Sequence, residues 1–284
     1  MSQRPDQRVG VLGLGIIGSR AAANLVAAGW NVACWNRSPK GLANEVARPE
    51  EAVKGAAVIS VYLKDSPTVR SVFGRIEACL EGGQIILNHA TLDLETTRWL
   101  HELCTKRGCR FLDAPFTGSK LAAEKGELFY YIGGSPELLD EVRELLGVTS
   151  RALLFCGDVG AATVVKLATN LISACTVQAL AEALGIVTSQ GISAATFASA
   201  VVENASASVL TAMKLPRMVA GDYDPHFSMS NMAKDSRYMV ALAESAGLQV
   251  PAIEAVSERM ESLVEEGLGD LDFSAVAQPY LQNP

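Results

Sequence analysis

Lys166 and Asn170 are residues whose types and spacing suggest chemistry. Lys166 lies in GAATVVKLATN (160–170), and Glu182 is the only other charged residue between positions 159 and 187. An unpaired ammonium is costly to bury, and burial lowers the pKa of a lysine toward neutrality. Asn170 follows four residues later, on the same face of a helix, and such a pair can polarise a carbonyl and protonate its oxygen. Taken alone, Lys166 also fits a lysine that buries its stem and keeps its ammonium in water.

A second pattern, GLGIIG at residues 13–18, has the G-x-G-x-x-G spacing of a dinucleotide-binding turn. It follows the apolar run RVGVLGL and opens a helical pattern, which is the context that such a turn requires. Gly13 permits the tight turn, Gly15 lets the backbone approach a pyrophosphate at the helix N-terminus, and Gly18 allows close helix–strand packing. The alternative is a tight turn with no ligand. The expected cofactor contacts in this turn are Gly13, Leu14, Gly15, Ile16, Ile17 and Gly18.

The residues after the second apolar run indicate which dinucleotide is bound. An acidic residue there would hydrogen-bond the ribose 2′-hydroxyl and favour NAD, but this chain has Asn36, Arg37 and Ser38. No carboxylate stands at these positions to repel a 2′-phosphate. Arg37 can offer the phosphate a bidentate contact, and Ser38 can add a hydroxyl. The sequence therefore predicts NADP(H) over NAD(H), and the alternative for Arg37 is a solvated loop residue.

The elements that must position these residues alternate between strand and helix in the first half of the chain. Strand-like runs at 8–14, 31–36, 56–63, 83–90 and 109–115 are separated by helical stretches, whereas the pattern from residue 160 onward is nearly all helical. The alternation predicts a parallel sheet with helices on both faces. We therefore expect an α/β dinucleotide-binding domain over residues 1–158. An all-helical domain over residues 159–284 should follow, joined to the first by a long helix that carries Lys166.

Further cofactor contacts are expected at the carboxyl ends of the strands, where open α/β sheets bind ligands. The segments YLKDS (62–66) and NHATL (88–92) should rim this crevice. Thr91 is the expected polar contact near the nicotinamide or its ribose. His89 has no visible orienting partner in the sequence, so an ordinary hydrogen-bonded histidine is expected there rather than an acid–base group.

The composition indicates the class of partner and the compartment. The 284 residues carry a net charge of −7, which argues against nucleic acid or an anionic membrane as the main partner. Six scattered cysteines and a polar N-terminus favour reduced thiols and no secretory signal, so a cytoplasmic protein is expected. The run 159–187 contains too many polar residues for a membrane span. His101 and Cys104 lack the further ligands of a zinc site, so no metal is expected.

Four segments occur in the order and at the spacing of one family. They are VGVLGLGIIGSRAAANLVAAGWNVACWNRSPKG, FLDAPFTGSKLAAEKGELFYYIGG, GDVGAATVVKLATN and FSMSNMAKD. On these segments the chain resembles the β-hydroxyacid dehydrogenases, the group that contains 3-hydroxyisobutyrate dehydrogenase, over nearly its full length. The resemblance implies an N-terminal Rossmann domain and a helical C-terminal domain through which subunits pair as a homodimer or homotetramer. Within the family, GSKLAAEKGEL (118–128) and GLGDLDFSAV (267–276) look most like the glyoxylate/succinic semialdehyde reductase branch.

The resemblance also implies roles for matching residues. Lys166 matches the catalytic lysine of the family, and Asn170 matches the asparagine that helps to place lysine and substrate. The residues that match the substrate-carboxylate loop are Thr117, Gly118 and Ser119, and those that match cofactor contacts are Leu63, Lys64, Thr91 and Lys234.

Three positions depart from the family pattern. Thr117 replaces the usual serine and adds a methyl group, Phe116 replaces the usual valine, and Thr169 replaces the first asparagine of K-x-x-N-N. These changes bear on the substrate more than on the reaction class.

The sequence predicts an NADPH-dependent reductase of a small, carboxylate-bearing aldehyde such as glyoxylate or succinic semialdehyde. One alternative is a 3-hydroxyisobutyrate-type dehydrogenase that works in the oxidative direction. Another is an imine reductase, but that related group usually lacks the lysine that is retained here as Lys166. A further alternative is a non-catalytic dinucleotide-binding module, which would be expected to lose Lys166 or Asn170.

Overall fold

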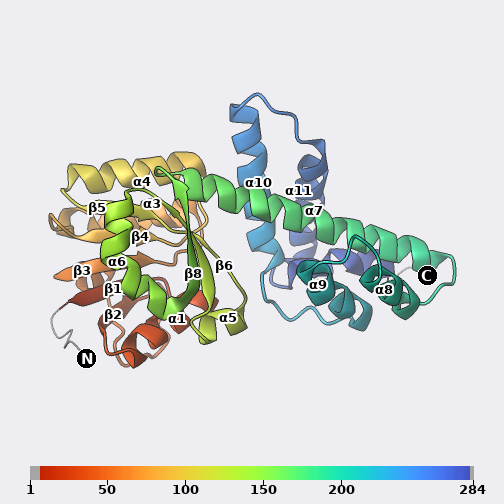
Figure 1. Ribbon diagram of the computed structural model, residues 1–284, viewed down its shortest axis with the longest axis horizontal. Coiled ribbons are helices and arrows are strands. Elements are labelled where there is room, and N and C mark those ends of the chain that lie inside the picture. The colour runs from red at the N-terminus through yellow and green to blue at the C-terminus, as the bar shows by residue number, and fades with distance from the viewer. Residues whose placement is uncertain (1–6, 282–284) are drawn as a thin grey trace. The chain divides into compact units, whose positions relative to one another are not determined.

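The computed structural model describes residues 7–281, and the chain divides into two compact units after Lys166. The division falls inside α7 (Ala161–Ser189), the long helix that begins the helical half of the chain. Each unit has its own hydrophobic core. The first unit is α/β and the second is helical, which confirms the predicted fold class (Figure 1).

The first unit is built on an eight-stranded sheet in which five adjacent strands run parallel. In sheet order these are β2 (Asn31–Trp35), β1 (Arg8–Leu12), β3 (Ala56–Val61), β4 (Ile85–Asn88) and β5 (Arg110–Asp113). The next strand, β7 (Leu128–Gly133), runs antiparallel to β5 and pairs with both β6 (Phe116–Thr117) and β8 (Ser150–Gly157). The carboxyl ends of the five parallel strands therefore meet at one edge.

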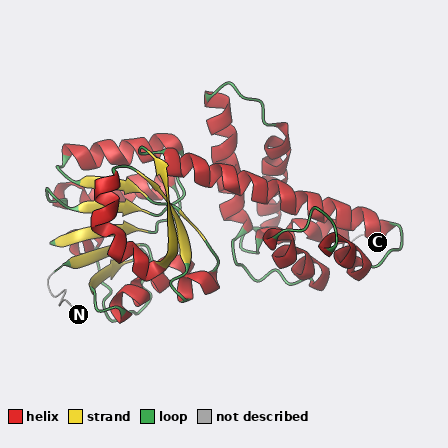
Figure 2. Cartoon of the chain, viewed as in Figure 1, coloured by secondary structure: helices red, strands yellow, loops and turns green. Residues whose placement is uncertain are grey.

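Helices cover both faces of this sheet, because successive strand side chains point to opposite sides (Figure 2). Val9 and Val11 of β1 share a core with α1 (Ile16–Ala27) and α6 (Pro136–Thr149). Leu12 of the same strand shares a second core with other helices. These are α2 (Pro49–Val53), α3 (Ser66–Ile76), the 3₁₀ turn Glu77–Cys79 and α4 (Leu94–Lys106).

The second unit packs helices around residues of α7 such as Leu167 and Leu184, both fully buried. Its elements are α8 (Ala194–Val202), α9 (Val209–Ala220), α10 (Met229–Ser245), α11 (Pro251–Leu263), the π turn Val264–Leu268, the 3₁₀ turn Phe273–Ala277 and α12 (Gln278–Leu281). Proline usually ends or kinks a helix, but Pro216 lies inside α9 and the helix continues to Ala220.

Among the described residues, α7 is the one helix long and apolar enough to cross a membrane by length and composition. A buried core helix passes the same test. α7 supplies Ala174, Val177, Ala181 and Leu184 to the core of the second unit, each fully buried. Packing within the protein accounts for only part of its apolar character, because 33% of its apolar window is buried, and Ile172 and Ile186 are 63% and 67% exposed.

Candidate active site

The turn from β1 to α1 admits only glycine at two of its positions. Gly13 has a φ of 99°, and its N–H donates to the Trp35 carbonyl at 2.8 Å. A Cβ at Gly13 would lie 2.5 Å from the Tyr62 carbonyl oxygen, and one at Gly18 would lie 2.1 Å from the Gly13 carbonyl oxygen. These close approaches are the tight turn and the close packing that the glycine spacing predicts.

Gly15 serves a different purpose, because a Cβ there would meet no atom within 4 Å. Gly15 is exposed and is the N-cap of α1, and it has no side chain to accept the first N–H groups of the helix. Those N–H groups and the helix dipole favour an anion. The turn therefore fits the pyrophosphate of a dinucleotide.

Three neighbours of these glycines take different positions. Ile16 is 44% exposed beside Gly15, whereas Leu14 is buried at 2% and Ile17 packs partly into the same core. The N–H of Leu14 donates to Asn36 Oδ1 at 3.0 Å. Leu14 and Ile17 thus support the turn through packing, and Ile16 stands at the open surface.

Asn36 fastens the loop after β2 to the glycine turn. Besides accepting from Leu14, its Nδ2 donates to the Ser38 carbonyl at 2.8 Å. Arg37 and Ser38 are exposed on this loop, with no acidic residue between Asn36 and Lys40. The loop can therefore present a guanidinium and a hydroxyl to a ligand held at the turn.

Glu45 organises the far side of the same loop and was not predicted from the sequence. Its carboxylate accepts from the backbone N–H groups of Lys40, Gly41 and Leu42 at 2.8–3.3 Å. The sequence gives no sign of this contact, because a glutamate in a polar loop is usually a solvated residue.

The expected contacts at β3 and β4 lie at the same sheet edge. Leu63 is 9% exposed and Lys64 is exposed, just after β3. Thr91 follows β4 and is partly buried. Because β1, β3 and β4 are adjacent and parallel, these residues share the edge that carries the glycine turn.

His89 is a structural residue, as expected. It is 1% exposed, Nδ1 lies 2.8 Å from the Ala114 carbonyl oxygen, and the ring stacks on Tyr62 with centroids 4.5 Å apart. Burial lowers the pKa of His89 to about 4, although the backbone contact with Ala114 opposes this. His89 is therefore neutral at neutral pH and is not a proton donor there.

The predicted substrate loop follows β5. Thr117 and Gly118 are exposed, and Gly118 has a φ of 144°. Ser119 is the N-cap of α5 (Lys120–Glu124), where its Oγ accepts from the Ala122 N–H at 3.3 Å. A hydroxyl that accepts one hydrogen bond can still donate another, so Ser119 can cap the helix and contact a carboxylate together.

Lys166 lies near the start of α7 and is 8% exposed, which confirms its predicted burial. The start of α7 is joined to the sheet through Asp113, the last residue of β5, whose Oδ2 accepts from the Thr163 N–H at 2.8 Å. Burial raises the pKa of Asp113 to about 6, against hydrogen bonds from Thr163, Gly160 and Asn88 that favour the ionised form.

Asn170 and Lys234 meet at Asp235 in the second unit. Asn170 Nδ2 donates to Asp235 Oδ2 at 2.7 Å, and Lys234 Nζ lies 2.9 Å from Asp235 Oδ1. All three residues are at least 92% buried, with exposed fractions of 8%, 7% and 1%. Asp235 was not predicted from the sequence, although it stands next to Lys234 in the FSMSNMAKD segment.

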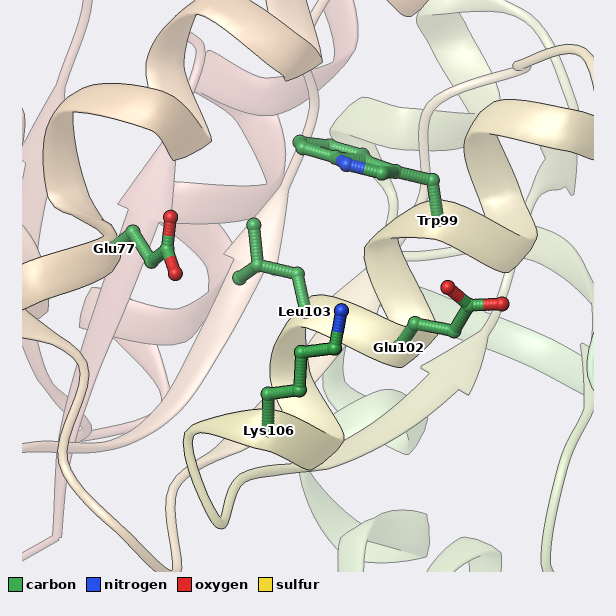
Figure 3. Close-up of a pocket in the computed structure, with 5 residues that line it drawn as sticks. All are labelled: Glu77, Trp99, Glu102, Leu103 and Lys106. Carbon is green, nitrogen blue, oxygen red and sulfur yellow. The ribbon is translucent and has the colours of Figure 1, made fainter.

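A surface pocket lies away from all of these residues. It is lined by Glu77, Trp99, Glu102, Leu103 and Lys106, mostly on α4 (Figure 3). Glu77 pairs with Arg107 at 3.1 Å, and the Arg70 guanidinium lies 4.7 Å from the centre of the Trp99 ring. The pocket is lined by no predicted site residue.

Two family models together match residues 8–280. Residues 8–164 match a family model described as the NAD binding domain of 6-phosphogluconate dehydrogenase. Residues 160–280 match a model described as NAD-binding of NADP-dependent 3-hydroxyisobutyrate dehydrogenase.

Individual proteins are also similar to this chain over nearly its full length. The chain is 31% identical to glyoxylate/succinic semialdehyde reductase 1 of Arabidopsis thaliana, over 95% of this chain and 97% of that protein. It is 26% identical to the cytokine-like nuclear factor N-PAC of Mus musculus, over 97% of this chain but 51% of that protein. Among solved structures, the 3-hydroxyisobutyrate dehydrogenase of Mycobacterium tuberculosis with L-serine has a TM-score of 0.88, at 24% identity over 97% of this chain and 99% of that one.

Proposed function

The chain belongs to the β-hydroxyacid dehydrogenase family of NAD(P)-dependent oxidoreductases acting on CH–OH groups, and on this premise we propose that it reduces small aldehyde acids with NADPH. The observation that carries the proposal is the buried Lys166, one helical turn beyond the point where Asp113 joins α7 to the sheet edge that carries the cofactor turn. The reaction class follows from the family. The cofactor preference and the substrate are the proposed parts.

Support for NADPH comes from the loop after β2. Asn36 holds this loop against the glycine turn, and the proposal assigns the exposed Arg37 and Ser38 to the adenosine end of a bound dinucleotide. A 2′-phosphate there would gain a charge-assisted contact from Arg37 and meet no carboxylate at positions 36–38. A ribose 2′-hydroxyl would gain much less from the same residues.

The chain's own residues account for the rest of the reaction. When bound, the reduced nicotinamide supplies the hydride. The Lys166 ammonium polarises the substrate carbonyl and protonates the alkoxide oxygen that forms. Asn170, four residues later on the same helix, helps to orient Lys166 and the substrate. Thr117, Gly118 and Ser119 hold the substrate carboxylate through hydroxyl and backbone N–H groups.

Support for an aldehyde acid comes from the Arabidopsis reductase, whose name gives glyoxylate and succinic semialdehyde as its substrates. The second candidate is oxidation of a hydroxy acid of the 3-hydroxyisobutyrate type. The family model that matches residues 160–280 favours this candidate, and the same residues serve it in reverse. In that direction Lys166 accepts the hydroxyl proton.

The test is a panel of substrates measured in both directions with both cofactors. We expect NADPH oxidation with glyoxylate and succinic semialdehyde, at a kcat/KM at least about tenfold above that of NADP⁺ reduction with 3-hydroxyisobutyrate. The reverse order would favour the second candidate. A cyclic imine in the panel serves as the control for imine reduction.

A binding module without catalysis is the remaining candidate, because the chain matches about half of the nuclear factor N-PAC. Retention of Lys166 and Asn170 counts against it. If NADPH binds but no member of the panel is turned over in either direction, the module is the correct assignment and the proposed enzyme is not.

A further inference from the structure

The helix that carries Lys166 begins at a residue that cannot cap it. Gly160 is the N-cap of α7, since its carbonyl accepts the first helical N–H, from Val164, at 3.0 Å. A helix usually takes Ser, Thr, Asp or Asn at this position, whose side chain accepts from the third residue of the helix. Gly160 has a φ of 94°, and a Cβ there would lie 2.7 Å from Leu94 Cδ1. A side chain at position 160 would therefore be strained by this backbone conformation and would require Leu94 to shift.

Asp113 supplies the missing cap from 50 residues away in the sequence. Its Oδ2 accepts from the N–H of Thr163, the third residue of α7, at 2.8 Å, and its two oxygens lie 2.9 and 3.0 Å from Thr163 Oγ1. The Thr163 hydroxyl also lies 3.1 Å from Thr97 Oγ1 on α4. The first turn of α7 is thus fastened to β5 and to α4.

Capping α7 with a buried carboxylate costs desolvation free energy. Asp113 is fully buried, and a neutral residue of similar size would avoid its desolvation. Its hydrogen bonds come from neutral donors, the backbones of Gly160 and Thr163 and the side chains of Thr163 and Asn88. An acid that is buried at such a cost is more readily explained by a requirement for position than by a contribution to stability.

The place of Asp113 in the chain indicates what it positions. Residue 114, directly after it, begins the segment that leads to Thr117, Gly118 and Ser119, and Lys166 follows Thr163 by three residues, about 4.5 Å along the helix. We propose that Asp113 is a positioning residue, which sets the distance between the substrate-carboxylate loop and the Lys166 ammonium by capping α7 from β5. This rests on the proposed roles of Lys166 and of that loop.

The test is a double-mutant cycle on steady-state kinetics with NADPH and the best aldehyde acid. In Asp113→Asn, one side-chain oxygen can still accept from Thr163. The other oxygen is replaced by an NH₂ group, which cannot accept from Gly160 or Thr163 and adds a donor to a site that already has these donors. We expect kcat to fall by about ten- to hundredfold, because a displacement of about 1 Å has effects of this size, with the Kd for NADPH changed less than about twofold. In a Lys166→Ala background the same substitution should change kcat by less than about twofold.

Two further variants serve as a milder perturbation of the cap and as a control. Thr163→Val keeps the backbone cap and removes the hydroxyl, so it should lower kcat by less than Asp113→Asn. If Asp113→Asn does not fold, Thr163→Val takes its place in the double-mutant cycle. Thr97→Val removes the hydroxyl that faces Thr163 from the other side, and we expect its kcat to stay within about twofold of wild type.

The outcomes separate this inference from the proposed function. A folded Asp113→Asn enzyme with wild-type kcat overturns the inference, as does an equal loss of kcat in the presence and absence of Lys166, which is the result of a merely structural role. If Lys166→Ala itself retains wild-type kcat, the proposed mechanism fails, and the positioning role fails with it.

Discussion

At the scale of single residues, the proposed choice of NADPH over NADH rests on two side chains, Arg37 and Ser38, in the loop after β2. Arg37 and Ser38 are exposed, and Asn36 ties their loop to the glycine turn through hydrogen bonds with the Leu14 N–H and the Ser38 carbonyl. The proposed preference for NADPH therefore depends on one exposed cation, Arg37, and a single substitution tests it.

Replacing Arg37 with alanine should raise the Kd for NADPH by about ten- to hundredfold, because a charge-assisted bidentate contact contributes about 1.5–3 kcal/mol. The Kd for NADH should change by less than about threefold. Fluorescence titration of both cofactors measures the ratio. Arg98→Ala, which removes another exposed arginine from α4, is the matched control. An unchanged ratio in Arg37→Ala would show that Arg37 is a solvated loop residue.

The sequence predicts site residues well where their relationship is local. The three glycines can be recognised from their spacing together with the apolar run before them and the helical pattern after them, because the whole strand–turn–helix unit is continuous in the sequence. The contacts from Asp113 to Thr163 and from Asp235 to Asn170 span 50 and 65 residues. No periodic pattern connects such pairs, so they become visible only in the fold.

At the scale of secondary-structure elements, one buried carboxylate fastens three segments of the second unit. Asp272 is fully buried and lies 2.6 Å from Lys214 Nζ of α9. It also accepts from the backbone N–H groups of His226, Phe227 and Ser274 at 3.0–3.1 Å. Burial alone would raise the pKa of Asp272, but the Lys214 ammonium and the hydrogen bonds hold it below its usual value.

Asp272→Asn should lower the free energy of unfolding by about 3–5 kcal/mol at pH 7, because it leaves the Lys214 ammonium buried without its counter-charge. A group whose pKa is lower in the folded state stabilises the fold above its unfolded pKa, and this contribution disappears as the pH falls through the folded value. The difference between wild type and variant should therefore narrow below about pH 4.

Urea unfolding at several pH values measures this difference. The control is Asp270→Asn, which changes an exposed carboxylate two residues away and should stay within about 0.5 kcal/mol of wild type. A difference between Asp272→Asn and wild type that is constant from pH 7 to pH 3 would contradict an ionised pair.

The long elements are predictable and the short ones are not. Short apolar runs identify the five parallel strands, and a long helical pattern from residue 160 identifies the helical half of the chain. The helices α2 and α5, of five residues each, and the two-residue strand β6 have no period to recognise. They form because neighbouring segments hold them. Ser119 caps α5, and β7 pairs with β6.

At the scale of the whole molecule, the family accounts for the architecture and the reaction class. A cofactor turn at one edge of a parallel sheet is followed by a helix that carries a buried lysine and asparagine. The substrate depends on finer features, such as Phe116 and Thr117 in the loop and Thr169 beside Asn170. Specificity resides in such side chains and not in the fold, because one architecture serves many substrates.

The central claim is that Lys166 provides the proton for carbonyl reduction, and the kcat of Lys166→Ala with saturating NADPH and glyoxylate or succinic semialdehyde tests it most directly. We predict a fall of at least about 100-fold, with the Kd for NADPH within about twofold of wild type, because the substitution removes the acid but not the cofactor turn. A folded variant that binds NADPH and turns over at the wild-type rate would contradict the claim.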